Sequence, residues 1–442
     1  MAIQLSDHFT YGKLLRFTVP SVIMVIFTSI YSVIDGLFVA NFAGATPFAA
    51  VNIVWPFIMI ISAIGFMFGS GGSALVAKTL GESHSYKANR IFSMLIYLTM
   101  VVGIVFATVG LLLIKPILLA CGVEGELLTQ SMLYAGILFP AIPALMLQVM
   151  FQSFMATAER PKLGLFVTVF AGVCNFILDA LLIIVWKWGL SGAAWATAAS
   201  QFIGAAIPLL YFTFPNKSLL HLGRTKLYIK ALIKTCTNGA SEFMSSISMS
   251  LIGILYNYQM LRFIGEDGVI IYGIITYVNF IFLAAFIGYT VGSNPIVGFH
   301  YGAGNKNELK SLLHKSLRLI LFAAVILTFV AEISAPQIAR IFVGKDAHLT
   351  AMTIYAFRIY SVSFLLSGFN IYASGFFTAL NNGLISAVIA FSRTMIFECI
   401  CVLILPILFG VNSIWSAITA AEIMALGVSF FFIKKMRGRY GY

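Results

Sequence analysis

The strongest constraint on the fold is a series of apolar stretches, each about 20 residues or longer, that recurs along the whole chain. Lipid cannot hydrogen-bond an open backbone, so stretches of this kind cross a membrane as α-helices. Hydrophobic residues make up 60% of the 442 residues and charged residues 10%, which leaves no polar stretch long enough for a water-soluble domain. We predict an all-α integral membrane protein with twelve transmembrane helices, over roughly 14–42, 50–77, 91–114, 131–156, 163–186, 190–214, 232–262, 269–299, 312–335, 350–379, 384–409 and 413–434.

The loops between these stretches carry an orientation signal. If both termini are cytoplasmic, 20 Lys and Arg residues fall on the cytoplasmic side and five on the external side. Basic residues gather in the cytoplasmic loops of membrane proteins, so the distribution favours this orientation. It also accounts for the net charge of +12 without nucleic acid, because the sequence has no basic stripe with interleaved aromatic residues on a polar scaffold.

The two halves of the sequence match each other at an offset of about 221 residues. The matched pairs include Phe42 and Phe263, Gly44 and Gly265, Gly81 and Gly302, Tyr134 and Tyr355, and Thr157 and Thr378. Each half holds six predicted crossings, so both halves begin on the same side and are related by an axis along the membrane normal. We predict two pseudo-symmetric six-helix lobes, over 1–214 and 232–442, joined by a basic cytoplasmic linker over 215–231.

Four polar residues inside the first six helices have no matching polar group in the second half. Asp35 lies in an apolar stretch, where an ionised carboxylate costs roughly 3 kcal/mol on insertion scales unless it has a partner, a proton or a cation. A requirement of the helical scaffold would appear in both halves, so we attribute these residues to function. The repeat pairs Asp35 with Tyr256, Asn175 with Ile396, Asp179 with Ile400 and Thr197 with Ile418.

Helical spacing indicates that these polar residues gather at one depth. Tyr31 and Asp35 are four residues apart, as are Asn175 and Asp179, so each pair shares a helix face. Asp35, Asp179 and Thr197 each fall about seven residues, roughly 10 Å, from the external ends of their helices. We predict a cation-coupling site formed by Asp35, Asp179, Asn175, Thr197, Tyr31 and Tyr134.

The chemistry of this predicted site suits H⁺ or Na⁺. Carboxylate, amide and hydroxyl oxygens are hard ligands, and occupancy by a cation would remove the repulsion between two neighbouring carboxylates. We expect Asp35, Asn175, Asp179 and Thr197 to hold Na⁺ if that is the ion. Pro20 removes a backbone hydrogen bond near the inner end of the same helix as Asp35 and is a predicted hinge. The alternative is that these polar groups are satisfied contacts between helices.

Three other buried charges are candidates for a substrate cleft. Glu242 lies about ten residues into its helix from the cytoplasm. It could face a cationic substrate, or it could pair with Arg358 or Arg393 as a structural bridge. The sequence has no P-loop, HExxH or GxSxG motif, so we expect neither direct ATP coupling nor an enzyme, and no organic cofactor.

The sequence of this chain resembles the multidrug and toxic compound extrusion (MATE) family. The likeness is carried by SVIDGLFV, by CNFILDALLI, and by GSGGSALVAKTLG with its repeat VGSNPIVGFHYGAG. It covers nearly the whole chain and fits the DinF-like branch best. The resemblance implies cation-site roles for the matching residues: Asp35 and Tyr31 in the first helix, Tyr134 in the fourth, Asn175 and Asp179 in the fifth and Thr197 in the sixth, with Pro20 as the matching proline.

The resemblance also marks a difference between branches of that family. The NorM-like branch uses acids in the seventh and tenth helices. Here the tenth stretch has no acid and carries Arg358, and Glu242 lies nearer the cytoplasm than that branch would predict. We therefore do not expect a NorM-type cation site in the second lobe.

The resemblance implies a function for the whole chain. We expect a secondary active multidrug antiporter of a bacterial or archaeal cytoplasmic membrane. It would export cationic amphiphilic compounds in exchange for H⁺ or Na⁺ and act as a monomer in the lipid bilayer. A flippase for lipid-linked saccharides is the alternative. That activity would favour a cationic central cavity to hold pyrophosphate, and Arg358 and Arg393 are the only cations that we expect to be buried.

Overall fold

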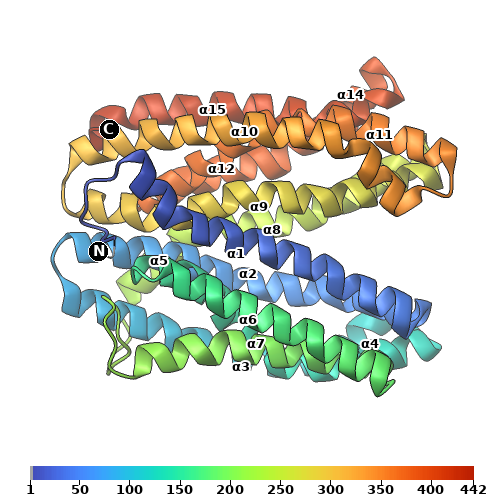
Figure 1. Ribbon diagram of the computed structural model, residues 1–442, viewed down its shortest axis with the longest axis horizontal. Helices are drawn as coiled ribbons and strands as arrows, with labels where there is room; N and C mark the ends of the chain where they lie inside the picture. Colours follow the sequence, from blue (N-terminus) through green and yellow to red (C-terminus); the bar gives the residue numbers. More distant parts are fainter. Residues whose placement is uncertain (1–2) are drawn as a thin grey trace.

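In the computed structural model, which describes residues 3–442, helices run nearly parallel along the long axis of the molecule (Figure 1). The first half contains α1 (Tyr11–Phe38), α2 (Ala45–Gly81), α3 (Ser85–Ala120), α4 (Gly125–Leu138), α5 (Ile142–Thr157), α6 (Pro161–Asp179) and α7 (Gly189–Thr213). The second half contains α8 (Ile229–Phe263), α9 (Glu266–Gly302), α10 (Lys306–Val343), α11 (Ala347–Ser361), α12 (Phe364–Ala379), α13 (Gly383–Phe391), α14 (Glu398–Phe409) and α15 (Ala417–Tyr440).

The helices account for the predicted membrane crossings. Within residues 3–442, ten helical segments are long and apolar enough to span a bilayer, and α11 with α12 forms an eleventh that bends by 45°. The remaining helix, α8, is less apolar because it carries Lys230, Lys234 and Glu242, yet its 35 residues run beside α9 along the molecule (Figure 1). The all-helical membrane fold is thus as predicted.

Some predicted single helices are built from several pieces. The stretch predicted over 131–156 is α4 and α5 joined by a 3₁₀ turn at Phe139–Ala141, where Pro140 and Pro143 limit backbone hydrogen bonding. Short π-helical turns occupy Val39–Ala43, Ala180–Val185 and Ser392–Phe397, and a 3₁₀ turn, Val411–Ser416, precedes α15.

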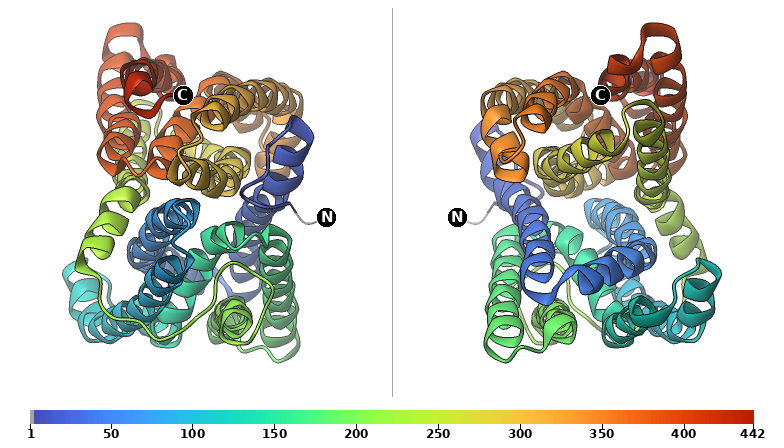
Figure 2. Two further views of the ribbon diagram at one scale, coloured as in Figure 1. Left: turned by 90° about the vertical axis from the view of Figure 1, so that its left-hand side faces the viewer. Right: turned by 90° about the vertical axis from the view of Figure 1, so that its right-hand side faces the viewer.

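The two halves of the chain form separate groups of helices, as the end-on views in Figure 2 show. Their backbones repeat. Gly44 and Gly265, 221 residues apart, both have positive φ and begin helices of 37 residues, and Gly189 and Gly410 have positive φ at the same offset. Glycine accommodates this left-handed region without steric penalty. Between the halves, the non-helical segment 214–228 is held against α3 by Asn89 and Ser93.

The halves contact each other through α1 and α2 on one side and α8 and α9 on the other. Glycines allow the closest approaches: a methyl group at Gly239 of α8 would lie 2.0 Å from the carbonyl oxygen of Met67, and one at Gly302 of α9 would lie 2.0 Å from that of Lys78. A methyl group at Gly292 of α9 would lie 3.1 Å from the Cα atom of Thr18 and 3.2 Å from the side chain of Ser21, both on α1.

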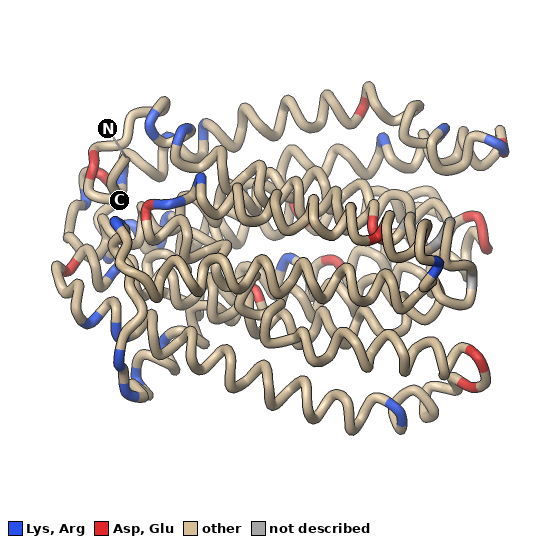
Figure 3. Tube along the Cα trace, turned by 60° about the horizontal axis from the view of Figure 1, so that its bottom comes forward, with Lys and Arg blue, Asp and Glu red and all other residues tan. Residues whose placement is uncertain are grey.

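These contacts lie toward the end of the molecule that holds both termini (Figure 1). At this end Glu308 of α10 accepts one hydrogen bond from the backbone N–H of Phe9 (2.9 Å) and pairs with His8 (2.6 Å). Many of the Lys and Arg residues gather there as well (Figure 3). By contrast, a methyl group at Gly36, Gly253 or Gly273, toward the opposite ends of α1, α8 and α9, would meet nothing within 4 Å.

Candidate cation site

The packing of α1 against α6 brings the two predicted acidic helix faces together. The ring of Phe38 meets the ring of Phe176 edge-on at 5.3 Å. Further along the same pair of helices, Phe27 fills the space beside Gly172, where an added methyl group would lie 2.5 Å from the Phe27 ring. Tyr31 and Asp35 lie between these two contacts along α1. On α6, Asn175 lies between them and Asp179 lies three residues beyond Phe176.

Asp35 and Asp179 contact each other side chain to side chain. Asp179 is 1% exposed. One carboxylate oxygen on each residue, Oδ1 in both cases, is buried and has no hydrogen-bond partner in the described part of the chain. Two carboxylates in contact repel each other when both are ionised, so a proton or a cation between them stabilises this arrangement.

Two of the remaining predicted residues, Tyr31 and Tyr134, lie near this pair, and Asn175 and Thr197 lie on the adjoining helices α6 and α7. Tyr31 and Tyr134 lie close enough to interact electrostatically with both carboxylates, and Tyr134 is fully buried. Asn175 is also buried. On α7, Gly192 packs against Leu182. Because α7 then runs antiparallel to α6, Thr197 lies near the level of Asp179.

The hydroxyl of Thr197 is buried and has no partner among the described residues. The site therefore combines buried carboxylate and hydroxyl oxygens that have no partner among the described residues, while the side chains of Tyr31 and Asp35 are partly exposed. Such hard oxygen donors fit a proton or Na⁺. Within residues 3–442, no three His, Cys, Asp or Glu side chains converge as a transition-metal site would require.

Two features of this site have no counterpart in the sequence analysis. A π-helical turn, Ala180–Val185, directly follows Asp179, and another, Val39–Ala43, begins four residues after Asp35. Such turns interrupt the regular hydrogen-bond ladder and are frequent at functional sites. In addition, Gln201 lies one turn after Thr197 on α7, is 3% exposed, and has a side-chain oxygen without a described partner. The four-residue spacing of Thr197 and Gln201 is the signal that could have identified it.

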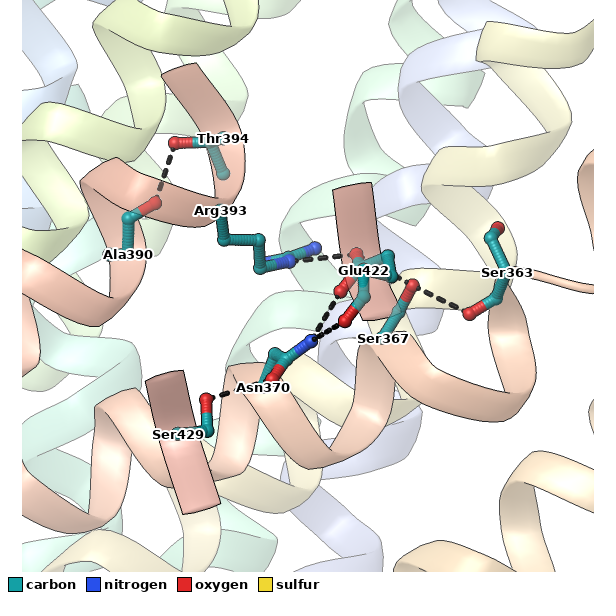
Figure 4. Close-up of polar contacts among 8 residues, drawn as sticks. All are labelled: Ser363, Ser367, Asn370, Ala390, Arg393, Thr394, Glu422 and Ser429. Carbon is teal, nitrogen blue, oxygen red and sulfur yellow. Dashed lines mark hydrogen bonds and ion pairs between the residues drawn. The ribbon is translucent and has the colours of Figure 1, made fainter. Parts of the chain in front are cut away.

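The second lobe holds a closed polar network (Figure 4). Arg393, in the π-helical turn Ser392–Phe397, donates to Glu422 of α15 at 2.8 Å. Glu422 also accepts from Ser367 at 2.8 Å and from Asn370 at 2.7 Å, and Asn370 accepts in turn from Ser429. Glu422 is 1% exposed, and both of its carboxylate oxygens are paired. This acid has protein partners, unlike the pair in the first lobe.

The three tentative cleft residues lie in different surroundings. Arg358 pairs with Glu332 of α10 at 3.6 Å, with both side chains partly exposed, and Arg393 pairs with Glu422. The structure therefore brings neither arginine into an ion pair with Glu242. Glu242 instead lines a small cavity between the two lobes.

Pro20 lies in an unbroken helix. It is buried within α1, which continues as an α-helix from Tyr11 to Phe38. Its neighbours Ser21 and Val22 contact Gly288 of α9. A bend at Pro20 would therefore alter the contact between the lobes, although the helix has no break there in this conformation.

Comparison with known proteins gives a consistent assignment. The MatE family profile matches residues 20–181 and 243–404, one stretch in each half. The multidrug export protein MepA of Staphylococcus haemolyticus is 23% identical over 97% of this chain and 94% of its own length. MepA of Staphylococcus saprophyticus is 23% identical over 94% of this chain and 92% of its own.

Solved structures share the fold. An outward-facing structure of a multidrug resistance MATE family transporter superposes with a TM-score of 0.94 at 20% identity, covering 100% of this chain and 98% of that one. A MATE structure in complex with MaL6 gives a TM-score of 0.93 at 19% identity, covering 98% of each chain.

Proposed function

This chain belongs to the MatE family, and we propose that it is a secondary active multidrug exporter that expels cationic amphiphilic compounds in exchange for H⁺ or Na⁺. The relatives named as multidrug export proteins support export of several drugs. The observation that carries the coupling mechanism is the contact between Asp35 and Asp179, each of which keeps a buried oxygen without a described partner.

The proposed coupling ion binds at Asp35 and Asp179, with Asn175, Thr197, Tyr31 and Tyr134 around it. Binding removes the repulsion between the two carboxylates. That change favours a different packing of α1 on α6, with Pro20 as the proposed hinge. Because α1 also packs against α9, movement of α1 alters the contact between the lobes. The ion can shift this equilibrium only by its difference in affinity for the two arrangements.

We infer that the protein adopts an outward-open arrangement in this structure. The lobes contact each other near the termini, where the basic residues gather, and the positive-inside rule assigns that end to the cytoplasm. In the proposed cycle, an external cation enters and occupies the first-lobe site, and the organic cation leaves outward. The lobes then close on the outside and open inward, where the ion leaves and new substrate binds.

The acids of the first lobe favour a DinF-like mechanism over a NorM-like one. The pair lies on α1 and α6, whereas α11 and α12 contain no acid. Among the three tentative cleft residues, Glu242 lines a cavity between the lobes, where its carboxylate would meet a positive charge. Arg358 and Arg393 are each paired with an acid, which weakens the alternative of a flippase that holds pyrophosphate.

Growth of a drug-sensitive bacterial strain on ethidium tests the proposal. We expect expression of the wild-type protein to raise the tolerated ethidium concentration, and Asp35→Asn or Asp179→Asn to abolish the gain at equal protein levels. Glu124→Gln, which changes an exposed acid before α4, is the matched control and should behave as wild type. Unchanged tolerance with the wild-type protein would refute the multidrug proposal, and full activity of Asp35→Asn would refute the coupling site.

A further inference from the structure

A second group of oxygen atoms lies apart from the Asp35–Asp179 site, at the contact between the two lobes. It surrounds a cavity of about 40 Å³. The first lobe contributes Ser70 and Ser73 from α2 and Ser153 from α5, and the second contributes Glu242 from α8 with Thr290 and Asn294 from α9. Glu242 lies one turn beyond Gly239, where α8 makes its closest approach to α2. The cavity therefore lies at the edge of the lobe interface.

Glu242 has no protein cation to balance it. None of the ion pairs within residues 3–442 includes this carboxylate, and Arg393, the cation whose charge acts on it, is held by Glu422 at 2.8 Å. Glu242 is only partly exposed, and a carboxylate withdrawn from water without a partner is unfavourable. A positive species in the adjoining cavity would stabilise it.

The other lining groups are suited to that role. The hydroxyls of Ser70 and Ser153 form no hydrogen bond to any described residue, and Thr290 donates to the carbonyl of Phe286, which leaves its oxygen lone pairs available. The side-chain nitrogen of Asn294 donates to the carbonyls of Gly375 and Thr290 at 3.2 and 3.1 Å. The side-chain oxygen of Asn294 is therefore available to a ligand. Carboxylate, hydroxyl and amide oxygens are the ligands that hard cations prefer.

The volume limits what can bind. A cavity needs about 10–15 Å³ of space to hold one water molecule, and drug-sized ligands occupy pockets of about 300–1,000 Å³. A cavity of about 40 Å³ therefore accepts one small ion with at most a few water molecules. We propose that this cavity is a second cation site, which binds a single Na⁺-sized inorganic cation between Glu242 and the hydroxyls of the opposite lobe. This site goes beyond the proposed exchange function, which requires only the first-lobe pair.

The position of the site gives it a conformational consequence. Its ligands come from both lobes, so it is complete only while α2 and α5 lie against α8 and α9 at this level. A cation bound there stabilises the arrangement seen in this structure over one in which the lobes separate at the termini. The first-lobe pair has no such requirement because α1, α6 and α7 all belong to one half of the chain.

Thermal unfolding of the purified full-length protein tests this second site. The background is Asp35→Asn/Asp179→Asn, which removes the first-lobe acids, and the salts are NaCl, LiCl, KCl and choline chloride at constant ionic strength. We expect Na⁺, and Li⁺ to a similar degree, to raise Tm with a saturable dependence, while K⁺ and choline have little effect. Adding Glu242→Gln should abolish the Na⁺ response.

A milder variant keeps the test informative if Glu242→Gln fails to fold. Ser153→Ala removes one hydroxyl that the first lobe contributes to the cavity. We expect this substitution to raise the half-saturating Na⁺ concentration about three- to tenfold, the effect of losing one polar contact. The proposal is overturned if the Asp35→Asn/Asp179→Asn background shows no saturable Na⁺ response. That result is expected if Glu242 binds only a proton. A response that survives Glu242→Gln also overturns it. Drug export by the wild-type protein is a separate measurement, so either proposal can fail alone.

Discussion

We propose that Thr197 supplies the first-lobe site with a hydroxyl but no charge. Its oxygen is buried without a described partner, at the level of Asp179. We expect Thr197→Val, which keeps the shape and removes the hydroxyl, to weaken cation binding by about three- to tenfold, the effect of one lost polar contact. The maximal efflux rate at saturating cation should change little because the carboxylates remain. Efflux measured against the cation concentration checks this, with Thr197→Ser as the control; identical curves for valine and threonine would remove Thr197 from the site.

Glu159 is an acid outside the membrane-spanning segments with an unusual setting. It lies between α5 and α6 and accepts a hydrogen bond from the backbone of Leu5 at 2.5 Å. Burial raises the pKa of Glu159 above its ordinary 4.5, although the bond from Leu5 opposes that change. Because the folded-state pKa exceeds the unfolded one, folding favours the protonated acid. The stabilising contribution is complete below the unfolded pKa and is lost as pH rises through the folded pKa.

We therefore predict that Glu159→Gln flattens the pH dependence of stability. The wild-type protein should lose thermal stability, relative to the variant, as pH rises from about 4.5 toward neutrality. Glutamine keeps an acceptor for Leu5 but cannot ionise. Tm measured across this pH range checks the expectation. Parallel curves for the two proteins would show that Glu159 titrates equally in the folded and unfolded states.

At the scale of single residues, the sequence predicts acids better than it predicts their partners. Asp35 and Asp179 stand out because they interrupt apolar stretches and because the repeat replaces them with Tyr256 and Ile400. Glu422 stands out less, since its repeat position holds Gln201, also a polar residue. Its pairing with Arg393, 29 residues away, depends on how α15 packs on the turn before α14, and spacing alone does not contain that information.

At the scale of helices, the contact between α2 and α8 holds the termini-bearing ends of the lobes together. A methyl group on Gly239 would lie 2.0 Å from the carbonyl oxygen of Met67, so the helices must separate to admit it. We expect Gly239→Ala to destabilise this conformation by about 1–3 kcal/mol, the usual effect of overpacking. Its matched control is Gly253→Ala on the same helix, where a methyl group would meet nothing within 4 Å.

Distances between spin labels on the two lobes check this expectation. Labels at the exposed positions Tyr86 and Lys310, on α3 and α10, report the separation of the lobes near the termini. Gly239→Ala should shift the distance distribution toward longer values, and Gly253→Ala should leave it unchanged. A wild-type distribution in Gly239→Ala would mean that this close approach does not control the conformation.

The number of crossings and the repeat could be predicted at this scale, while local irregularities could not. Apolar length determines where a helix crosses lipid, so the twelve stretches coincide with helices. The 45° bend between α11 and α12 and the π-helical turn after Asp179 arise from packing between neighbouring helices. Pro20 illustrates the opposite case: the residue indicates a bend, yet α1 continues through it.

At the scale of the whole molecule, the two lobes share a backbone repeat but differ in their polar interiors. In the first lobe, Asp35 and Asp179 each keep a buried carboxylate oxygen that no described residue satisfies, whereas in the second lobe Glu422 is paired with Arg393 and with the side chains of Ser367 and Asn370. Glu242 lies between the lobes and faces a cavity that both line. This asymmetry supports ion binding in one lobe and a conformational response across the interface.

Transport by purified protein in liposomes tests the coupling site most directly. Ethidium movement is followed while a H⁺ gradient or a Na⁺ gradient is imposed separately, with wild-type protein, Asp179→Asn and the control Glu124→Gln. We predict that at least one gradient drives ethidium in the opposite direction through the wild-type and control proteins, and that Asp179→Asn shows no gradient-driven movement while remaining folded. Gradient-driven transport by Asp179→Asn at the wild-type rate would contradict the assignment of the first-lobe carboxylates as the coupling site.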